Sequence, residues 1–154
     1  MGLDISGVGT FGQGKCEANV SAGGVTASAV CGTTSQNGDV CRAEASVSGV
    51  TIVTPDNAHT IEATGLSTEV ETTCCTFRSS SSVASLTIDG ETYDVGSESE
   101  RIEVDGLLVI VNLENFSCGN GDMAGRVRLA LWVVYNGFSV RAAYSQASSG
   151  PCPC

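Results

Sequence analysis

The sequence has little positive charge and no long apolar run. The chain has 17 acidic residues but only 7 lysines and arginines, which gives a net charge of -10 over 154 residues. Such a chain repels nucleic acids and anionic membrane surfaces, so neither is an expected partner. Apolar runs such as residues 107–111 are far shorter than the ~20 residues of a membrane helix. We therefore expect no insertion into a membrane.

Motifs of catalysis and of metal binding are also missing. The chain has no G-x-S-x-G or phosphate-binding glycine motif and no paired C-x2-C spacing. Its single histidine, His59, stands in a polar stretch after Pro55 and is expected to be a solvated loop residue. Aromatic residues make up 5% of the chain, too few to indicate a cleft for stacking sugars. We predict that the protein is not an enzyme, with no catalytic residues and no metal ligands.

Helical periodicity is absent, whereas the alternation of β-strands is frequent. Residues 42–48 alternate small apolar and polar side chains. Residues 127–135 turn apolar on both faces, which predicts a central strand covered on both sides. Further strands are expected at 16–22, 25–31, 50–54, 60–65, 66–73, 82–88, 91–95, 101–104, 107–113 and 138–146. The fold class is therefore all-β, a single antiparallel β-sandwich or jelly roll.

Turn residues separate these strands. Asp89-Gly90, Asp105-Gly106 and Asn136-Gly137 are hairpin signals, because these residue types accept a positive φ. Longer loops at 37–39, 55–57 and 119–122 combine Asp, Asn and Gly. Their oxygen atoms would suit calcium in an acidic extracellular protein. The same residues also serve as ordinary turn residues, so no cofactor is predicted and calcium stays an open alternative.

The N-terminal residues 1–14 differ from the rest of the chain. They hold five glycines and place Leu3, Ile5 and Phe11 in a loose alternation. This segment is either the first strand of the chain's own sheet or an extended arm that adds a donor strand to a neighbour's sheet. Glycines favour the second use, because they allow close approach to another backbone. We divide the chain into this arm, a sandwich domain at 15–148, and a Cys-Pro-Cys tail at 149–154.

Eight cysteines indicate an oxidising location outside the cytoplasm. Adjacent residues on a strand face opposite ways, so Cys74 and Cys75 are expected to reach different partners. The start of the chain shows no signal peptide, so export would follow removal of a leader or release by cell lysis, as for a spore surface. We expect intersubunit disulfides from Cys74, Cys75, Cys152 and Cys154. We expect internal disulfides from Cys16, Cys31, Cys41 and Cys118.

A series of strand-like segments carries a resemblance to a known family. The segments are AEASVSGVTI (43–52), IEA (61–63), TTC (72–74), SLTIDG (85–90), GLLVIVNLE (106–114) and VRLALWV (127–133). Their order resembles the choice-of-anchor P family, secreted or surface-attached β-rich proteins of Gram-positive bacteria, over roughly residues 40–147. The resemblance implies an all-β fold at the cell exterior and no catalytic residues. The many cysteines depart from the family and favour direct assembly over an anchor.

These features together predict a structural protein. We expect a subunit of an extracellular homopolymer, such as a filament, spore appendage or surface layer, whose partner is the chain itself. Strand addition would position the subunits and disulfides would lock them. One alternative is a monomeric surface or adhesion module that binds a ligand through its loops. A small secreted hydrolase is a second alternative, and it would need a concave site around His59 or a pair of acidic residues.

Overall fold

The computed structural model describes residues 2–5, 13–37, 40–73, 76–118 and 124–149, and every regular element in them is a strand. No described segment forms a helix that could span a membrane. The strands are β1 (Gly2–Ile5), β2 (Gln13–Ala22), β3 (Val25–Asn37), β4 (Val40–Val53), β5 (Thr60–Thr73), β6 (Thr76–Ser82), β7 (Ser85–Ile88), β8 (Glu91–Tyr93), β9 (Glu100–Val104), β10 (Leu107–Cys118), β11 (Ala124–Tyr135) and β12 (Phe138–Ser149).

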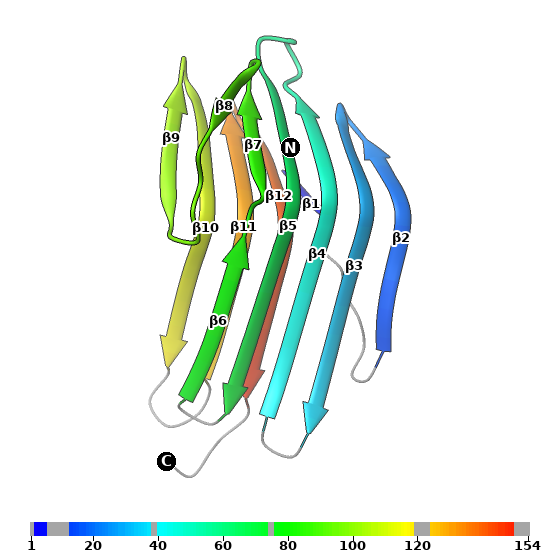
Figure 1. Cartoon of the computed structure of the whole chain (residues 1–154), viewed down its shortest axis with the longest axis vertical. Helices are drawn as coiled ribbons and strands as arrows, with labels where there is room; N and C mark the ends of the chain where they lie inside the picture. The colour runs from blue at the N-terminus through cyan, green and yellow to red at the C-terminus, as the bar shows by residue number, and fades with distance from the viewer. Residues whose placement is uncertain (1, 6–12, 38–39, 74–75, 119–123, 150–154) are drawn as a thin grey trace.

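Two sheets pack face to face, which confirms the predicted all-β sandwich (Figure 1). One sheet has five strands in the order β1-β12-β11-β10-β9, and we call it sheet A. The other, sheet B, has seven strands in the order β2-β3-β4-β5-β7-β8, with β6 also paired to β5. All neighbours are antiparallel except β1 and β12, which run parallel. β12 packs against β4 and β5 across the sandwich.

The core fills the space between the sheets. Branched aliphatic side chains from both sheets are almost fully buried there, and each stabilises the fold by about 1.5–3 kcal/mol. The largest are Ile52, Ile61, Leu66, Leu86 and Ile88 from sheet B, and Leu107, Val109, Val111 and Leu131 from sheet A.

The three predicted hairpin turns are confirmed. Asp89-Gly90, Asp105-Gly106 and Asn136-Gly137 all have positive φ at both positions. Each turn joins strands in direct register, as for Tyr135 and Phe138. These turns lie at one end of the sandwich, together with the loop that carries His59, and we call this the histidine end (Figure 1). At the opposite end, the cysteine end, β4 begins and β5, β10 and β12 stop.

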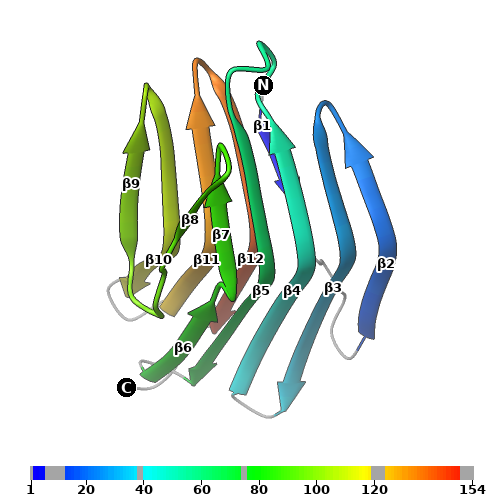
Figure 2. The same ribbon diagram turned by 45° about the horizontal axis from the view of Figure 1, so that its top comes forward.

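Both sheets bend along a line that crosses their strands halfway (Figure 2). In sheet B the line passes through Ala29 of β3 and Gly65 of β5, whose φ angles are +46° and +60°. In sheet A it passes through Asn112 of β10 and Ala143 of β12, at +55° and +56°. A single left-handed residue shifts the alternation of buried and exposed side chains by one position. In β5, for example, Ala63 and Leu66 are both buried.

The bend explains where the predicted strands differ from the observed ones. The segments 42–48 and 50–54 are parts of one strand, β4, and the segments 60–65 and 66–73 are parts of β5. Conversely, the predicted strand 82–88 is interrupted, since β6 ends at Ser82 and β7 begins at Ser85. Ala84 still donates its backbone N–H to Thr64 O at 2.9 Å, so the two strands line up along β5.

β11 is the middle strand of sheet A, as predicted, but only one of its faces is covered. Leu131 and Val133 are buried in the core between the sheets, whereas Trp132 and Val134 on the outer face are half-buried. The expectation of cover on both faces is therefore wrong for these two side chains. Val134 pairs with Leu108 and Trp132 with Ile110, both also half-buried, so the four residues form an apolar patch on the outer face.

Candidate functional site: sheet edges and cysteines

The N-terminal strand β1 occupies one edge of sheet A. Its register with β12 places Leu3 opposite Val140 and Ile5 opposite Ala142, and both β12 partners are fully buried. β1 therefore lies in its own chain's sheet here, which is the first of the two uses the sequence allows. Donation of this strand to a neighbour remains a prediction. Phe11, the third donor-strand candidate, lies outside the described residues.

The opposite sheet ends in an open edge. β2 pairs with β3 on one side, and no described strand pairs with it on the other (Figure 1). Its residues Cys16–Asn19 are exposed on both faces of the strand. Unpaired backbone N–H and C=O groups along such a strand can accept another extended chain.

Cys16 of β2 and Cys31 of β3 form an intrachain disulfide next to this edge. The two residues are directly opposite each other in the antiparallel register, with Cα atoms 4.1 Å apart. The bridge fastens the outermost strand to the sheet. A formed disulfide also indicates an oxidising environment.

The other six cysteines belong to the cysteine end or lie beyond the described residues. Cys41 is the second residue of β4, is 8% exposed and carries a free thiol, so the structure does not place it in an internal disulfide. Cys118 is the last residue of β10. Cys74, Cys75, Cys152 and Cys154 lie outside the described residues. In the sequence, the first pair follows Thr73 at the end of β5, and the second pair follows Ser149 by a few residues.

At the histidine end, His59 is buried, at 5% exposure, so the expectation of a solvated loop residue is wrong. Its Nδ1 donates to Asp89 Oδ2 at 2.7 Å, and Asp89 Oδ1 accepts from the Thr60 backbone N–H at 2.8 Å. The ring also stands edge-on to Tyr135, with centroids 5.0 Å apart. His59 thus joins the loop before β5 to the turn after β7 and to the end of β11.

Hydrogen bonds and charges around His59 shift the pKa values of the ring and of its neighbours. The hydrogen bond that His59 donates to Asp89, together with the charge of Asp89 and the backbone of Asp105, raises the pKa of His59 despite burial. The same bond lowers the pKa of Asp89. Tyr135 donates its hydroxyl to Asp56 Oδ2 at 2.9 Å, which raises the pKa of Tyr135. All polar atoms named here already have hydrogen-bond partners. The cluster is therefore better suited to holding the turns together than to acid–base chemistry.

A second polar cluster crosses the interior between the sheets. Arg128 of β11 is 8% exposed and donates to Ser81 of β6, to Glu114 of β10 and to the Ser97 carbonyl oxygen. Asn112 accepts from Ser81 at 2.7 Å and donates to the Gly96 carbonyl oxygen at 2.7 Å. This network attaches the segment before β9 to both sheets. All three guanidinium nitrogens of Arg128 donate hydrogen bonds within this network.

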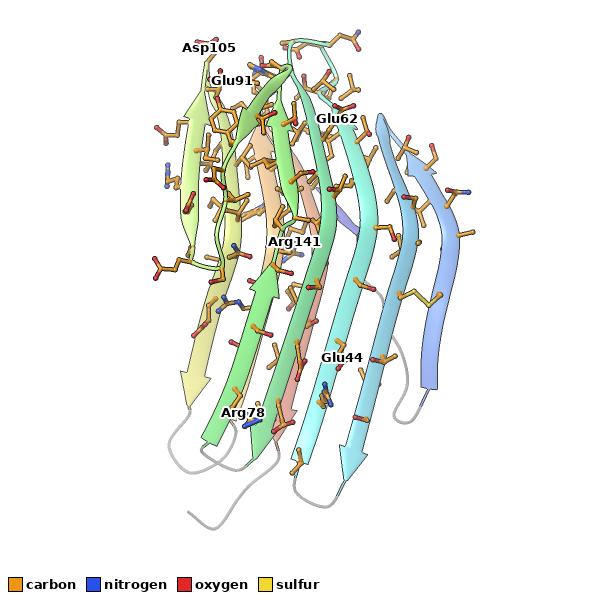
Figure 3. All side chains as sticks on the ribbon, in the orientation of Figure 1. Glu44, Glu62, Arg78, Glu91, Asp105 and Arg141 are labelled. Carbon is orange, nitrogen blue, oxygen red and sulfur yellow. A yellow bond between two sulfur atoms is a disulfide. The ribbon has the colours of Figure 1, made fainter. Side chains whose placement is uncertain are left out.

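The outer face of sheet B is covered with hydroxyl groups. Two shallow troughs cross it, of about 300 and 400 Å³. Glu44 and Glu62 stand on this face in Figure 3, among serines and threonines of β3–β7. Arg42 forms ion pairs there with Glu44 and Glu69 at 2.5 and 3.0 Å. None of the described residues that line the troughs is aromatic.

Within the described ranges, no three or more His, Cys, Asp or Glu side chains gather in a way that could hold a metal ion. Comparison with protein-family models, curated proteins and solved structures finds no match for this chain. The reasoning about function therefore rests on the sheet edges, the outer faces and the cysteines.

Proposed function

We propose that the chain is a structural subunit of a disulfide-stabilised extracellular homopolymer, such as a filament, spore appendage or surface layer. The observation that carries the proposal is the parallel pairing of β1 with β12 at a sheet edge. Only four residues make this pairing, and residues 6–12, with three glycines, connect them to β2 in the other sheet. The same backbone hydrogen bonds can form with β12 of a second copy.

Strand exchange of this kind would have a direction. The donor surface is β1 and the acceptor surface is the free side of β12, so a subunit that donates to one neighbour still accepts from another. Such head-to-tail contacts generate a fibre unless the rotation between subunits closes a ring. Exchange also costs little free energy, because Leu3 keeps Val140 as its register partner in either arrangement.

Two further surfaces support assembly. The apolar patch of Leu108, Ile110, Trp132 and Val134 has no described element packed on it, and a neighbouring subunit would remove it from water. Cysteines other than Cys16 and Cys31 would supply covalent locks between subunits. In the proposal, Cys74, Cys75 and the tail supply these locks after strand exchange has positioned the subunits. The resemblance to the choice-of-anchor P family agrees with a place outside the cell.

Electron microscopy of the full chain and of a variant lacking residues 2–14 tests the proposal. Without reducing agent, the full chain should form regular filaments or layers. The truncated chain should fold, since it keeps the core, β3–β12 and all of β2 but Gln13 and Gly14, yet stay dispersed. Regular assembly by the truncated chain, or dispersed particles of the full chain at every concentration, would refute strand exchange.

A synthetic peptide of residues 1–14 provides the matched control. The peptide should bind the truncated chain and fill the vacated edge beside β12. A peptide with Leu3→Asp and Ile5→Asp should not bind, because both positions are in register with buried residues. Asp4→Asn should weaken binding far less than this pair of changes, because its register partner Arg141 is not buried.

The monomeric binding module remains the second candidate, and the hydroxyl-lined troughs on sheet B favour it. Their lining of serine, threonine and glutamate offers hydrogen bonds to a polar ligand. This function predicts dispersed particles and disulfides within one chain only. The microscopy above separates the two candidates directly.

A further inference from the structure

Among the described strands that end the two sheets, β2 is the longest. It has 10 residues, whereas β1 has 4, β9 has 5 and β8 has 3. Short edge strands are one way in which natural sheets avoid pairing with other chains. β2 also contains no proline, which would interrupt a ladder of hydrogen bonds. Its free side is therefore the sheet edge best able to bind another extended strand.

β2 is already fixed in the extended form that such pairing needs. The Cys16–Cys31 bridge joins it to β3, and the antiparallel register continues on both sides of the bridge. The strand lies at the outer end of sheet B, beyond β1 and β12 of the facing sheet (Figures 1 and 2). A strand that is ordered before it binds loses little conformational entropy on binding.

The backbone groups of Cys16 point to the free side of β2. Opposite residues in an antiparallel pair alternate between close pairs without mutual hydrogen bonds, about 4.5 Å apart, and hydrogen-bonded pairs, about 5.5 Å apart. The Cα atoms of Cys16 and Cys31 are 4.1 Å apart, so these residues form a close pair. The N–H and C=O of Cys16 therefore point away from β3, where a second strand can bind them.

Charge selects the register of that second strand. The charged residues of β2 are Lys15 and Glu17. A lysine in an edge strand discourages pairing in most registers. In an antiparallel pair of two β2 strands centred on Cys16, however, Lys15 of each copy lies opposite Glu17 of the other. Centring the pair on Lys15 or on Glu17 instead places like charges opposite each other, which is destabilising.

We propose that the free edge of β2 binds β2 of a second copy of this chain, antiparallel and centred on Cys16. Two copies of sheet B then form one continuous sheet. The contact uses the same surface on both copies, so it closes as a two-fold pair and differs from the head-to-tail exchange of β1. It does not depend on that exchange. If β1 exchange builds filaments, β2 pairing joins them side by side, and without exchange it gives a dimer.

Two full-length charge-reversal variants test the pairing. Lys15→Glu leaves two glutamates in β2 and Glu17→Lys leaves two lysines, so neither variant should pair with itself. An equimolar mixture should pair, because each glutamate again lies opposite a lysine. Sedimentation velocity without reductant should show the pair for the unchanged protein and for the mixture, and its loss for each variant alone. If the chain forms filaments, electron microscopy should show paired and single filaments in the same pattern.

Three outcomes would overturn the proposal. The first is an unchanged protein that neither dimerises nor forms paired filaments at any concentration. The second is pairing by either variant alone, since another segment, such as β1 of a second copy, would then occupy the edge. The third is a mixture of the two variants that does not pair. The truncation of residues 2–14 tests β1 exchange separately, so failure of one proposal does not decide the other.

Hydrogen exchange at single amides provides an independent check. In the paired protein the Cys16 N–H should be protected, and in Lys15→Glu it should exchange quickly, because it points to the free edge. The Glu17 N–H points to β3 by the same alternation, so it should stay protected in both proteins and serves as the control. Rapid exchange at Cys16 in the paired protein would show that the copies associate through another surface.

Discussion

At the residue scale, His59 shows how one side chain fastens several turns together. Its ring is buried, hydrogen-bonded to Asp89 and packed against Tyr135, so it links sheet B to sheet A at the histidine end. The acidic groups that face it are Asp89 and Asp105, with Asp56 behind Tyr135. These partners favour the protonated ring over the neutral one, which raises the pKa of His59.

The raised pKa of His59 predicts that stability falls as the solution becomes alkaline. A group with a raised folded-state pKa contributes fully below its unfolded value of 6.5, and the contribution disappears as pH rises through the folded value. Asp89→Asn should remove most of this dependence, because the variant no longer favours the charged ring. Urea unfolding at about pH 6 and about pH 8.5 measures the effect. The unchanged protein should lose more stability between these pH values than the variant does.

The exposed Asp94, on the connection that follows β8, offers a control with the same loss of charge. Asp94→Asn should keep the pH dependence of the unchanged protein. Equal pH dependence in all three proteins would mean that the His59–Asp89 pair does not govern stability in this range. The location of His59 could not be predicted from sequence, because its burial depends on Asp89, thirty residues further along the chain.

At the scale of elements, the bend in sheet B depends on Gly65. This residue has φ +60°, and a Cβ added to it would lie 2.6 Å from Ala84 Cβ. Gly65→Ala should therefore be destabilising for two reasons. A left-handed alanine costs about 1–2 kcal/mol, and forcing apart the packed strands adds about 1–3 kcal/mol. Chemical denaturation with an unchanged m-value would measure the loss.

Gly90 in the turn after β7 isolates the first of these costs. Its φ is +84°, yet nothing lies within 4 Å of an added Cβ. Gly90→Ala should thus cost only the backbone part and unfold at a higher denaturant concentration than Gly65→Ala. If the two variants were equally stable, the close approach of β5 to Ala84 would contribute nothing to the bend.

The contrast between turns and bends shows which elements a sequence can reveal. Asp89-Gly90 and Asn136-Gly137 were predictable because residue chemistry alone favours positive φ over two positions. The bend at Gly65 was not, because it shifts a period-two pattern by one residue without ending the strand. A shift of that kind looks the same as a boundary between two strands. The half-covered face of β11 was missed for a related reason, since apolar composition does not say what packs on it.

At the scale of the whole molecule, the distribution of charge and cysteine bears on assembly. The sequence predicted internal cysteines but could not pair them, because pairing depends on topology. Cys16 and Cys31 meet through the register of β2 with β3, and Cys41 lies at the cysteine end because β4 begins there. The donor-strand role of Leu3 and Ile5 stays a prediction, since the same register of β1 with β12 would form within a chain or between chains.

A net charge of -10 predicts that assembly depends on salt. Subunits of like charge repel each other over about 30 Å at 10 mM salt but over less than about 10 Å at physiological ionic strength. Polymerisation should therefore be slow in dilute buffer and accelerate steeply as sodium chloride is added, as followed by light scattering.

Magnesium and calcium should act alike at equal ionic strength, since the described residues gather no ligand cluster for either ion. If micromolar calcium alone triggered assembly, screening would be an insufficient explanation, and the Asp- and Asn-containing loops would become the site to mutate. If added salt dissolved the polymer, its contacts would be chiefly ionic, and the exchange of β1 could not be what holds the subunits together.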